Sequence, residues 1–525
     1  MLFHRSDATK SNQYLDKLFP APSLPPSALS PQRLPGSTPE TLSALLRVLK
    51  DNHEHHHIYV NETRHNHIVH RALALYALGA SGPMIEGYYM ADSEGQRKAY
   101  DSPEQITEEN FVEHLGDQDY YQGYLSFFTD RVEEKGASKA LEGYVFSKEY
   151  NFQQGRTTET QPEMLFRLMT GILHPMIHVG YGLEFGLKGI LAEGLAMAAV
   201  HDVCERGFYP PSFFEASADV AVDEQTAELL ASLTLNSSPG SATASASSKD
   251  VHAFSILARM LKDDQFKSRA PRAHDRQWID TLAELGTEIR RYAEQWTVNG
   301  DIEKKMEELI WTSTVIYAVG GFNGTDRFLA DFHLMHLVTS SLFVSSIIPY
   351  LSPRSQVLFL RAYLTTILAW WIARGRPVLD FESFMTRTPV QPTIPIDLLP
   401  TPTATIPNTQ TPNSFLPILQ SAMSHSGDHV CKTQRALAHC SALYGDHPSE
   451  SFKGTELEGA ELLDGSVFVR AALLTADYVG WVREGQQSRR WSFEGFYGHQ
   501  AGMEHQVGMG HQAGMGHRAG MGHDS

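Results

Sequence analysis

Histidines spaced three or four residues apart recur along this chain. Residues at that spacing share one face of a helix, so a pair can turn two side chains in the same direction. Neutral imidazole is a good ligand for iron, zinc, copper and nickel. Several such pairs beside apolar runs therefore predict a metal site. The pairs are His67 and His70, His174 and His178, His333 and His336, and His429 with Lys432.

For any single histidine, packing in the core or at the surface is the commoner role. The pairs gain weight together because helical bundles build metal sites from side chains on facing helices. Acidic partners are scarce. Glu-x-x-His spacing occurs only within residues 54–65, so a di-iron carboxylate centre is not expected. The acids nearest the pairs are Asp331, Asp428, Glu184 and Glu193, of which the last two could orient His178.

Lys432 stands one helical turn after His429. An ammonium group cannot bind a cation, but a lysine in an apolar site loses its proton more easily. The neutral amine can then add CO2 and become a carbamate, which would supply an anionic ligand. An ordinary solvated lysine is the alternative.

Helical periodicity dominates the elements that must position these residues. It predicts a mainly α fold, a large bundle-like single domain with the metal site between helices and only a few short strands. The stretch Gly180-x-Gly182-x-x-x-Gly186 has the wrong spacing for a dinucleotide-binding loop and no strand before it. A Rossmann domain is therefore not expected.

Composition shifts divide the chain. A Pro- and Ser-rich stretch predicts a disordered arm over residues 1–40, and one helical domain is expected over residues 41–490. Low-complexity insertions are expected at about 235–249 and 386–413. Residues 498–525 repeat a Gly/His/Met hexapeptide, which could bind metal weakly but is more simply a disordered expansion.

The overall composition narrows the classes of function. A net charge of −18 without a basic patch argues against nucleic-acid binding and favours a small neutral or apolar substrate. Three cysteines without CxxC spacing fit a reducing compartment, and no secretory signal is evident, so a cytoplasmic protein is expected. Arg361 interrupts the long apolar run at 357–373, which therefore predicts a buried helix and no membrane span.

Four segments together resemble the questin oxidase-like family of fungal polyketide pathways. They lie at residues 65–80, 173–184, 331–341 and 428–437, and the resemblance extends over about residues 40–485. It implies oxidative cleavage of an aromatic polyketide ring, such as an anthraquinone or a xanthone precursor. Members are described either as Baeyer–Villiger-type oxidases that use NADPH or as non-haem iron oxygenases with histidine ligands and a carboxylated lysine.

The lack of a Rossmann signature favours the iron version, with Fe(2+), O2 and a small aromatic polyketide as partners, and NADPH as the alternative cofactor. The resemblance then implies His70, His178, His336 and His429 as ligands and Lys432 as the carbamate. His67 and His174 are alternates, because spacing cannot choose within a pair, and His333 is the least expected. Aromatic residues that could line the pocket, or simply pack in the core, are Tyr181, Phe185, Trp370 and Trp371.

Two other functions stay open. One is an NADPH-dependent monooxygenase, with or without flavin, in which the histidines are structural or acid/base groups. The other is a helical metal-binding protein without turnover, for which the repeat tail is the main support.

Overall fold

A computed structural model of the chain describes residues 13–215, 250–267, 276–298, 300–322, 327–392 and 412–497. Helices make up nearly all of the regular structure in these ranges, and extended pairing there is limited to isolated bridges such as that between Tyr59 and His65. The mainly α prediction is confirmed, and the few expected strands are reduced to these bridges. The α-helices are α2 (Pro39–His55), α3 (Ile68–Ala77), α4 (Gly82–Ser93), α5 (Tyr121–Lys135), α6 (Ala137–Leu141), α7 (Met164–Met169), α8 (His174–Phe185), α9 (Lys188–Val200), α11 (Ala253–Lys262), α12 (Gln277–Glu294), α13 (Ile302–Gly321), α14 (Phe332–Ser341), α15 (Val344–Ile347), α16 (Pro353–Ala373), α17 (Phe381–Arg387), α18 (Phe415–Met423), α19 (Asp428–Tyr444) and α20 (Val467–Val479).

Capping residues and prolines begin several helices. The Thr38 hydroxyl accepts a hydrogen bond from the backbone N–H of Thr41, and Pro39 occupies the first turn of α2. Asp331 caps α14 by accepting hydrogen bonds from two backbone N–H groups of its first turn. Pro175 lies in the first turn of α8, where its missing N–H leaves no hydrogen bond unmade.

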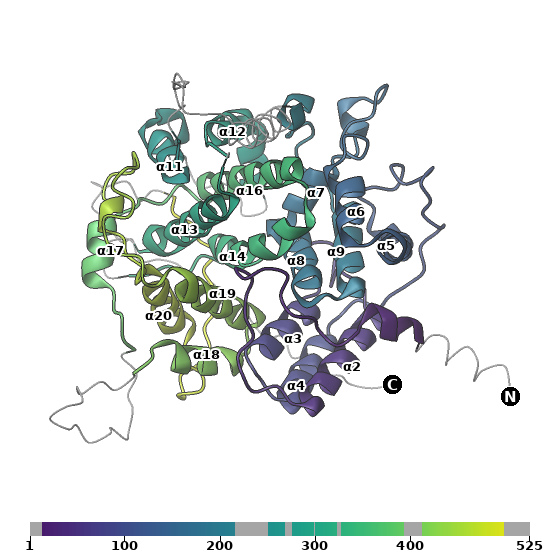
Figure 1. The fold of residues 1–525 in the computed structure, drawn as a ribbon, viewed down its shortest axis with the longest axis horizontal. Coiled ribbons are helices and arrows are strands. Elements are labelled where there is room, and N and C mark those ends of the chain that lie inside the picture. Colours follow the sequence, from purple (N-terminus) through teal and green to yellow (C-terminus); the bar gives the residue numbers. More distant parts are fainter. Residues whose placement is uncertain are drawn as a thin grey trace, which may run out of the picture.

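Four of the helices meet around one region of the core. Helix α3 packs against α8 and α19, and α14 packs against the same two helices. In Figure 1, α14 lies near the middle of the molecule, with α2 to α4 below it on one side and α18 to α20 on the other. Each of the four helices carries one of the histidine pairs or begins beside it, so the fold gathers segments that are far apart in sequence.

Glycines allow α8 and α9 to approach closely. A Cβ on Gly194 of α9 would lie 2.7 Å from the backbone nitrogen of Val179 on α8, which is too close for any larger residue. This approach brings Glu193 of α9 within hydrogen-bonding distance of His178 on α8.

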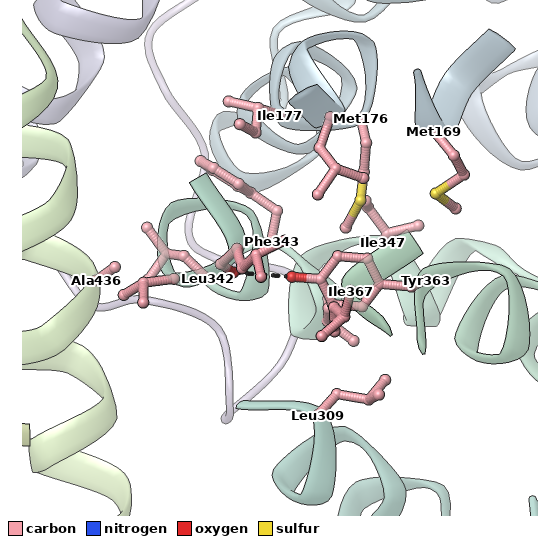
Figure 2. Close-up of a cluster of buried hydrophobic side chains, with 14 of the residues drawn as sticks. Met169, Met176, Ile177, Leu309, Leu342, Phe343, Ile347, Tyr363, Ile367 and Ala436 are labelled. Atoms are coloured by element: carbon pink, nitrogen blue, oxygen red, sulfur yellow. Dashed lines mark hydrogen bonds between the residues drawn. The ribbon is translucent and has the colours of Figure 1, made fainter. Parts of the chain in front are cut away.

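Apolar side chains from many helices fill the interior. Figure 2 shows part of this core, where Met176 and Ile177 of α8 face Ile347 of α15 and Tyr363 of α16. All four are buried. The core therefore holds α8 and α14–α16 in a fixed relation, and these elements carry much of the candidate site.

The expected disordered arm is ordered over its described part. Residues 13–18 are helical, and Leu15, Leu18 and Phe19 are buried against the helical domain. Their helical spacing is the signal that the Pro- and Ser-rich composition of the arm obscured. The insertion at 235–249, most of that at 386–413 and the tail at 498–525 lie outside the described residues. The first residues of the second insertion belong to α17.

Two stretches are long and apolar enough to cross a membrane, Phe332–Tyr350 and Pro353–Ala373. In both, 89% of the apolar window is buried inside the protein. They have the burial expected of core helices in a soluble protein, as the sequence predicted for 357–373.

Candidate metal centre

Three histidines from three helices form the candidate centre. His67 precedes the first residue of α3, His174 is the first residue of α8, and His429 lies in the first turn of α19. One ring nitrogen from each lies within 4.8 Å of one from each of the others. His336 of α14 adjoins this cluster, with its ring centroid 4.9 Å from those of both His174 and His429.

An acceptor lies beside the Nδ1 atom of each of these four rings. The carboxylate of Asp428 serves two of them, with Oδ2 2.9 Å from His67 Nδ1 and Oδ1 3.0 Å from His429 Nδ1. Backbone carbonyls serve the others. His174 Nδ1 lies 2.5 Å from the Gly171 oxygen, and His336 Nδ1 lies 2.7 Å from the Phe332 oxygen.

Carbonyl and carboxylate oxygens can only accept, so each Nδ1 carries the hydrogen and each neutral ring presents a lone pair on Nε2. The Nε2 atoms of His67 and His174 face each other at 2.7 Å. Two lone pairs at that distance repel unless a proton or a cation lies between them. The Nε2 atoms of His336 and His429 are buried and have no hydrogen-bond partner within the described ranges. These donors fit a metal ion.

Burial keeps the four imidazoles neutral. It lowers the pKa of His67, holds the pKa values of His174 and His336 well below the usual value, and lowers that of His429 to about 3. Burial acts to raise the pKa of Asp428, but the hydrogen bond from His429 and the charge of Lys432 outweigh it and hold that pKa well below its usual value. The site therefore combines neutral nitrogen donors with an ionised carboxylate behind them, as metal binding requires.

The other two predicted ligands form a separate hydrogen-bonded chain. His70 Nε2 lies 3.1 Å from His178 Nδ1, and His178 Nε2 lies 2.8 Å from Glu193 Oε2. The second oxygen of Glu193 lies 2.6 Å from His53 Nδ1. His178 thus has a partner on both nitrogens, and Glu193 orients it as the sequence suggested. This arrangement favours His67 and His174, the alternates of their pairs, as the metal donors.

Lys432 is buried, and its Nζ donates to Asp428 Oδ2 at 3.0 Å. The lysine therefore lies in the wall of the site. Its partner is the Asp428 carboxylate, which the sequence indicated only as a neighbour of His429. The other acids near the histidine pairs have different partners. Asp331 forms an ion pair with Arg374, and Glu184 forms one with Arg435.

A cavity of about 800 Å³ opens beside the cluster, and His67, His174 and His429 all line it. Trp278 and Trp370 also line it, and their rings stack with centroids 4.3 Å apart. Such a space suits a small planar ligand.

The predicted pocket aromatics divide between the cavity and the core. Trp370 lines the cavity, whereas Tyr181 and Phe185 are not among its lining residues. Tyr181 stacks on the His70 ring at 5.2 Å, and Phe185 packs near Tyr76. Trp371 is fully buried. These placements favour packing roles for Tyr181, Phe185 and Trp371. His333, the least expected ligand, stacks on Trp370 at 5.1 Å.

Two cavity histidines were not proposed as ligands from the sequence. The His65 ring stacks on that of His174 at 4.3 Å, and the His201 ring stacks on that of His65 at 5.4 Å. Both line the cavity. His201 has no second histidine at helical spacing, so pair spacing gave no signal for it.

Comparison with known proteins places the chain in a family. The chain is 26% identical over 355 residues to a Baeyer-Villiger oxidase of Paecilomyces divaricatus, covering 65% of this chain and 70% of that protein. It is 27% identical over 434 residues to a Baeyer-Villiger monooxygenase of Aspergillus aculeatus (79% and 82%) and 26% identical over 357 residues to a questin oxidase of Aspergillus terreus (66% and 73%). The questin oxidase-like family model matches residues 64–437. Because that match spans more than half of the chain, this protein belongs to the questin oxidase-like family and is an oxidoreductase.

Proposed function

We propose that this protein is a mononuclear non-haem iron oxygenase that opens a ring of an aromatic polyketide of the anthraquinone type. The family and the names of its relatives support an oxidase that acts on such compounds. The observation that carries the iron assignment is the facing pair of unprotonated Nε2 atoms of His67 and His174, 2.7 Å apart, beside the buried Nε2 of His429.

In this proposal His67, His174 and His429 hold the ion, with His336 beside them. Asp428 fixes the rings of His67 and His429 through their Nδ1 atoms, which keeps the Nε2 lone pairs turned to one point. Bound iron would supply the one-electron chemistry with O2 that organic side chains lack. The side of the cluster that faces the cavity stays open for a ligand.

The cavity would orient the substrate. Trp278 and Trp370 give its lining apolar aromatic surface, against which a fused aromatic ring system can pack. A surface of this kind also excludes water from the reacting face, which protects an oxidised ring from unwanted hydrolysis.

Metal analysis of the purified protein tests the assignment. We expect about one iron per chain, most of it lost in His174→Ala and His429→Ala, and full retention in His439→Ala. His439 is a matched control because it lies on α19 like His429 but bonds to the Leu29 carbonyl. Full iron content and activity in both cluster variants would overturn the iron proposal.

The carbamate on Lys432 has a separate test. Lys432→Arg keeps a positive charge beside Asp428 but cannot add CO2, so it should lose iron and activity if the carbamate is a ligand. The ion pair with Asp428 supports an ordinary charged lysine, and in that case Lys432→Arg should retain most of its iron. In wild-type protein freed of metal and CO2, added bicarbonate should increase iron binding only if the carbamate forms, and it should have no effect on Lys432→Arg.

An NADPH-dependent Baeyer–Villiger monooxygenase without iron is the second candidate, and the names of two relatives favour it. An absorbance scan for flavin and an NADPH-consumption assay on metal-free protein separate the two.

We place the reaction in the cytoplasm, which the three free cysteines support. A metal-binding protein without turnover is the third candidate. Deletion of residues 498–525 should abolish metal binding in that case only.

A further inference from the structure

His201 lies in the same cavity as the metal centre but outside the cluster of donors. Its Nδ1 lies 3.1 Å from the Asp202 carbonyl oxygen and 3.1 Å from the Thr170 hydroxyl. The carbonyl can only accept, so Nδ1 carries the hydrogen and Nε2 presents a lone pair. The ring thus has the fixed orientation and the free acceptor that a base requires.

A strained turn makes room for this nitrogen. A Cβ on Gly171 would collide with His201 Nε2, so only glycine fits at that position. Gly171, Ile172 and Leu173 all adopt left-handed backbone conformations, with φ of 56°, 54° and 65°. This conformation is unfavourable for leucine and more so for β-branched isoleucine, and such strain persists mainly at functional sites.

The same turn serves the metal centre. The Gly171 carbonyl accepts from His174 Nδ1, and Gly171 and Ile172 line the cavity. The backbone at 171–173 therefore fixes a metal donor on one side and His201 on the other. Between them lies His65, whose ring stacks on both, so His174 and His201 are separated by one imidazole. A ligand of two or three fused rings can reach both.

We propose that His201 is the base that removes the proton from a phenolic hydroxyl of the ligand in this cavity. The O–H bond breaks, the proton forms a bond to Nε2, and the electron pair stays on the oxygen as a phenolate. A phenolate gives up an electron more readily than a phenol, so this step would prepare the ring for oxidation. The inference rests on the proposed function, because it takes the ligand to be a phenolic aromatic compound.

Burial disfavours the imidazolium that forms, and groups beside the ring offset part of this effect. The Asp202 carbonyl and the Thr170 hydroxyl lie at its Nδ1, and the charge of Asp202 favours the protonated ring. Arg167, which donates to the His201 carbonyl, opposes it. Burial lowers the pKa of His201, so the ring is neutral and ready to accept a proton at neutral pH.

The ionisation state of a bound chromophore tests the inference. Emodin, a trihydroxyanthraquinone, changes its visible absorption band when a hydroxyl ionises, and it can be titrated into the purified protein at a pH where free emodin is neutral. We expect the ionised band with wild-type protein, a neutral band with His201→Gln, and the ionised band with the control His439→Gln. Iron content should be equal in all three.

The outcomes separate this inference from the proposed function. An ionised band in His201→Gln, or a neutral band with wild-type protein, would overturn the assignment of His201, whatever the iron content. Absence of iron from wild-type protein would overturn the iron proposal. The absorption band of bound emodin would still test the role of His201. Should His201→Gln not fold, a neutral band with wild-type protein would still overturn the assignment. Emodin should bind at least tenfold more tightly than its fully O-methylated ether, and equal affinity would contradict the inference.

Discussion

Asp428 is the residue on which the most contacts of the site converge. Its two oxygens lie against His67, His429 and Lys432. In Asp428→Asn one acceptor becomes an N–H donor, so one of the two histidines loses its anchor and can take the other tautomer. Loss of such an anchor weakens metal binding about 10- to 100-fold. Titration of the metal-free variant with Fe(2+) under anaerobic conditions should show this weakening.

Asp264→Asn is the matched control, because Asp264 is an exposed residue that pairs with Lys267. It should bind iron with wild-type affinity. Equal affinity in Asp428→Asn and wild-type protein would mean that the carboxylate does not orient the donors.

At the scale of single residues, the sequence identified segments whose histidines the structure brings together, but spacing left open which histidine of each pair faces the candidate centre. Helical spacing gives only the direction of the Cβ atoms. The choice depends on which Nδ1 finds an acceptor. His174, His336 and His429 find theirs within four residues along the chain. His67 finds its acceptor only in Asp428 of the distant α19, which tertiary structure brings to it. Likewise, the shortage of acids near the histidine pairs favours a carbamate on Lys432. Asp428, one helical turn before Lys432, already supplies a carboxylate there.

Among the elements, the N-terminus of α19 depends on a side chain from α3. Arg71 pairs with Asp92 at 2.9 Å and donates to the backbone carbonyls of His425 and Ser426 at 2.8 and 2.9 Å. These carbonyls belong to the loop that leads directly into Asp428. Arg71→Met would leave these carbonyls and the half-buried Asp92 carboxylate without this donor, which costs about 1–3 kcal/mol.

We therefore expect Arg71→Met to lower both the free energy of unfolding, measured with urea, and the iron content. Arg47→Met is the comparison, because Arg47 forms an exposed pair with Glu86 that contributes less than about 1 kcal/mol. If Arg71→Met unfolds more easily but binds iron normally, Arg71 stabilises the fold without positioning α19.

The contact between α8 and α9 gives a second prediction at this scale. Gly194→Ala places a methyl group against the backbone of Val179, and neither backbone can yield without moving its helix. Overpacking of this kind costs about 1–3 kcal/mol. Thermal unfolding should show a lower midpoint for Gly194→Ala, whereas Gly87→Ala, where a Cβ meets nothing within 4 Å, should not destabilise the protein. An unchanged midpoint in Gly194→Ala would show that the two helices can separate freely.

Helices were the most predictable elements, because capping residues, prolines and apolar spacing are local signals. Thr38, Pro175 and Asp331 begin helices as such signals indicate. The left-handed turn at 171–173 had no local signal beyond Gly171, since isoleucine and leucine argue against that conformation. Tertiary contacts impose it, and for that reason the sequence could not reveal the position of His201.

For the molecule as a whole, buried neutral histidines should make stability depend on pH. Burial lowers the pKa of His57 and of His439 to about 4, whereas an unfolded histidine has a pKa near 6.5. Between these values the unfolded chain binds more protons than the folded one, so the free energy of unfolding must fall as the pH falls from about 6.5 to about 4. Each such histidine contributes up to about 1.4 kcal/mol per pH unit within this window.

His439 is not among the histidines of the candidate metal centre and bonds to the Leu29 carbonyl, so its share can be measured separately. Urea unfolding of wild-type protein and His439→Gln at matched iron content, between pH 7.5 and 4.5, should show the same slope above pH 7. Below pH 6.5 the variant should lose stability more gradually, by up to about 1.4 kcal/mol per pH unit. Its stability at pH 7.5 can differ for packing reasons, but that offset does not change with pH. Parallel curves for the two proteins across the acid range would therefore show that His439 binds its proton equally well in the folded and unfolded chains.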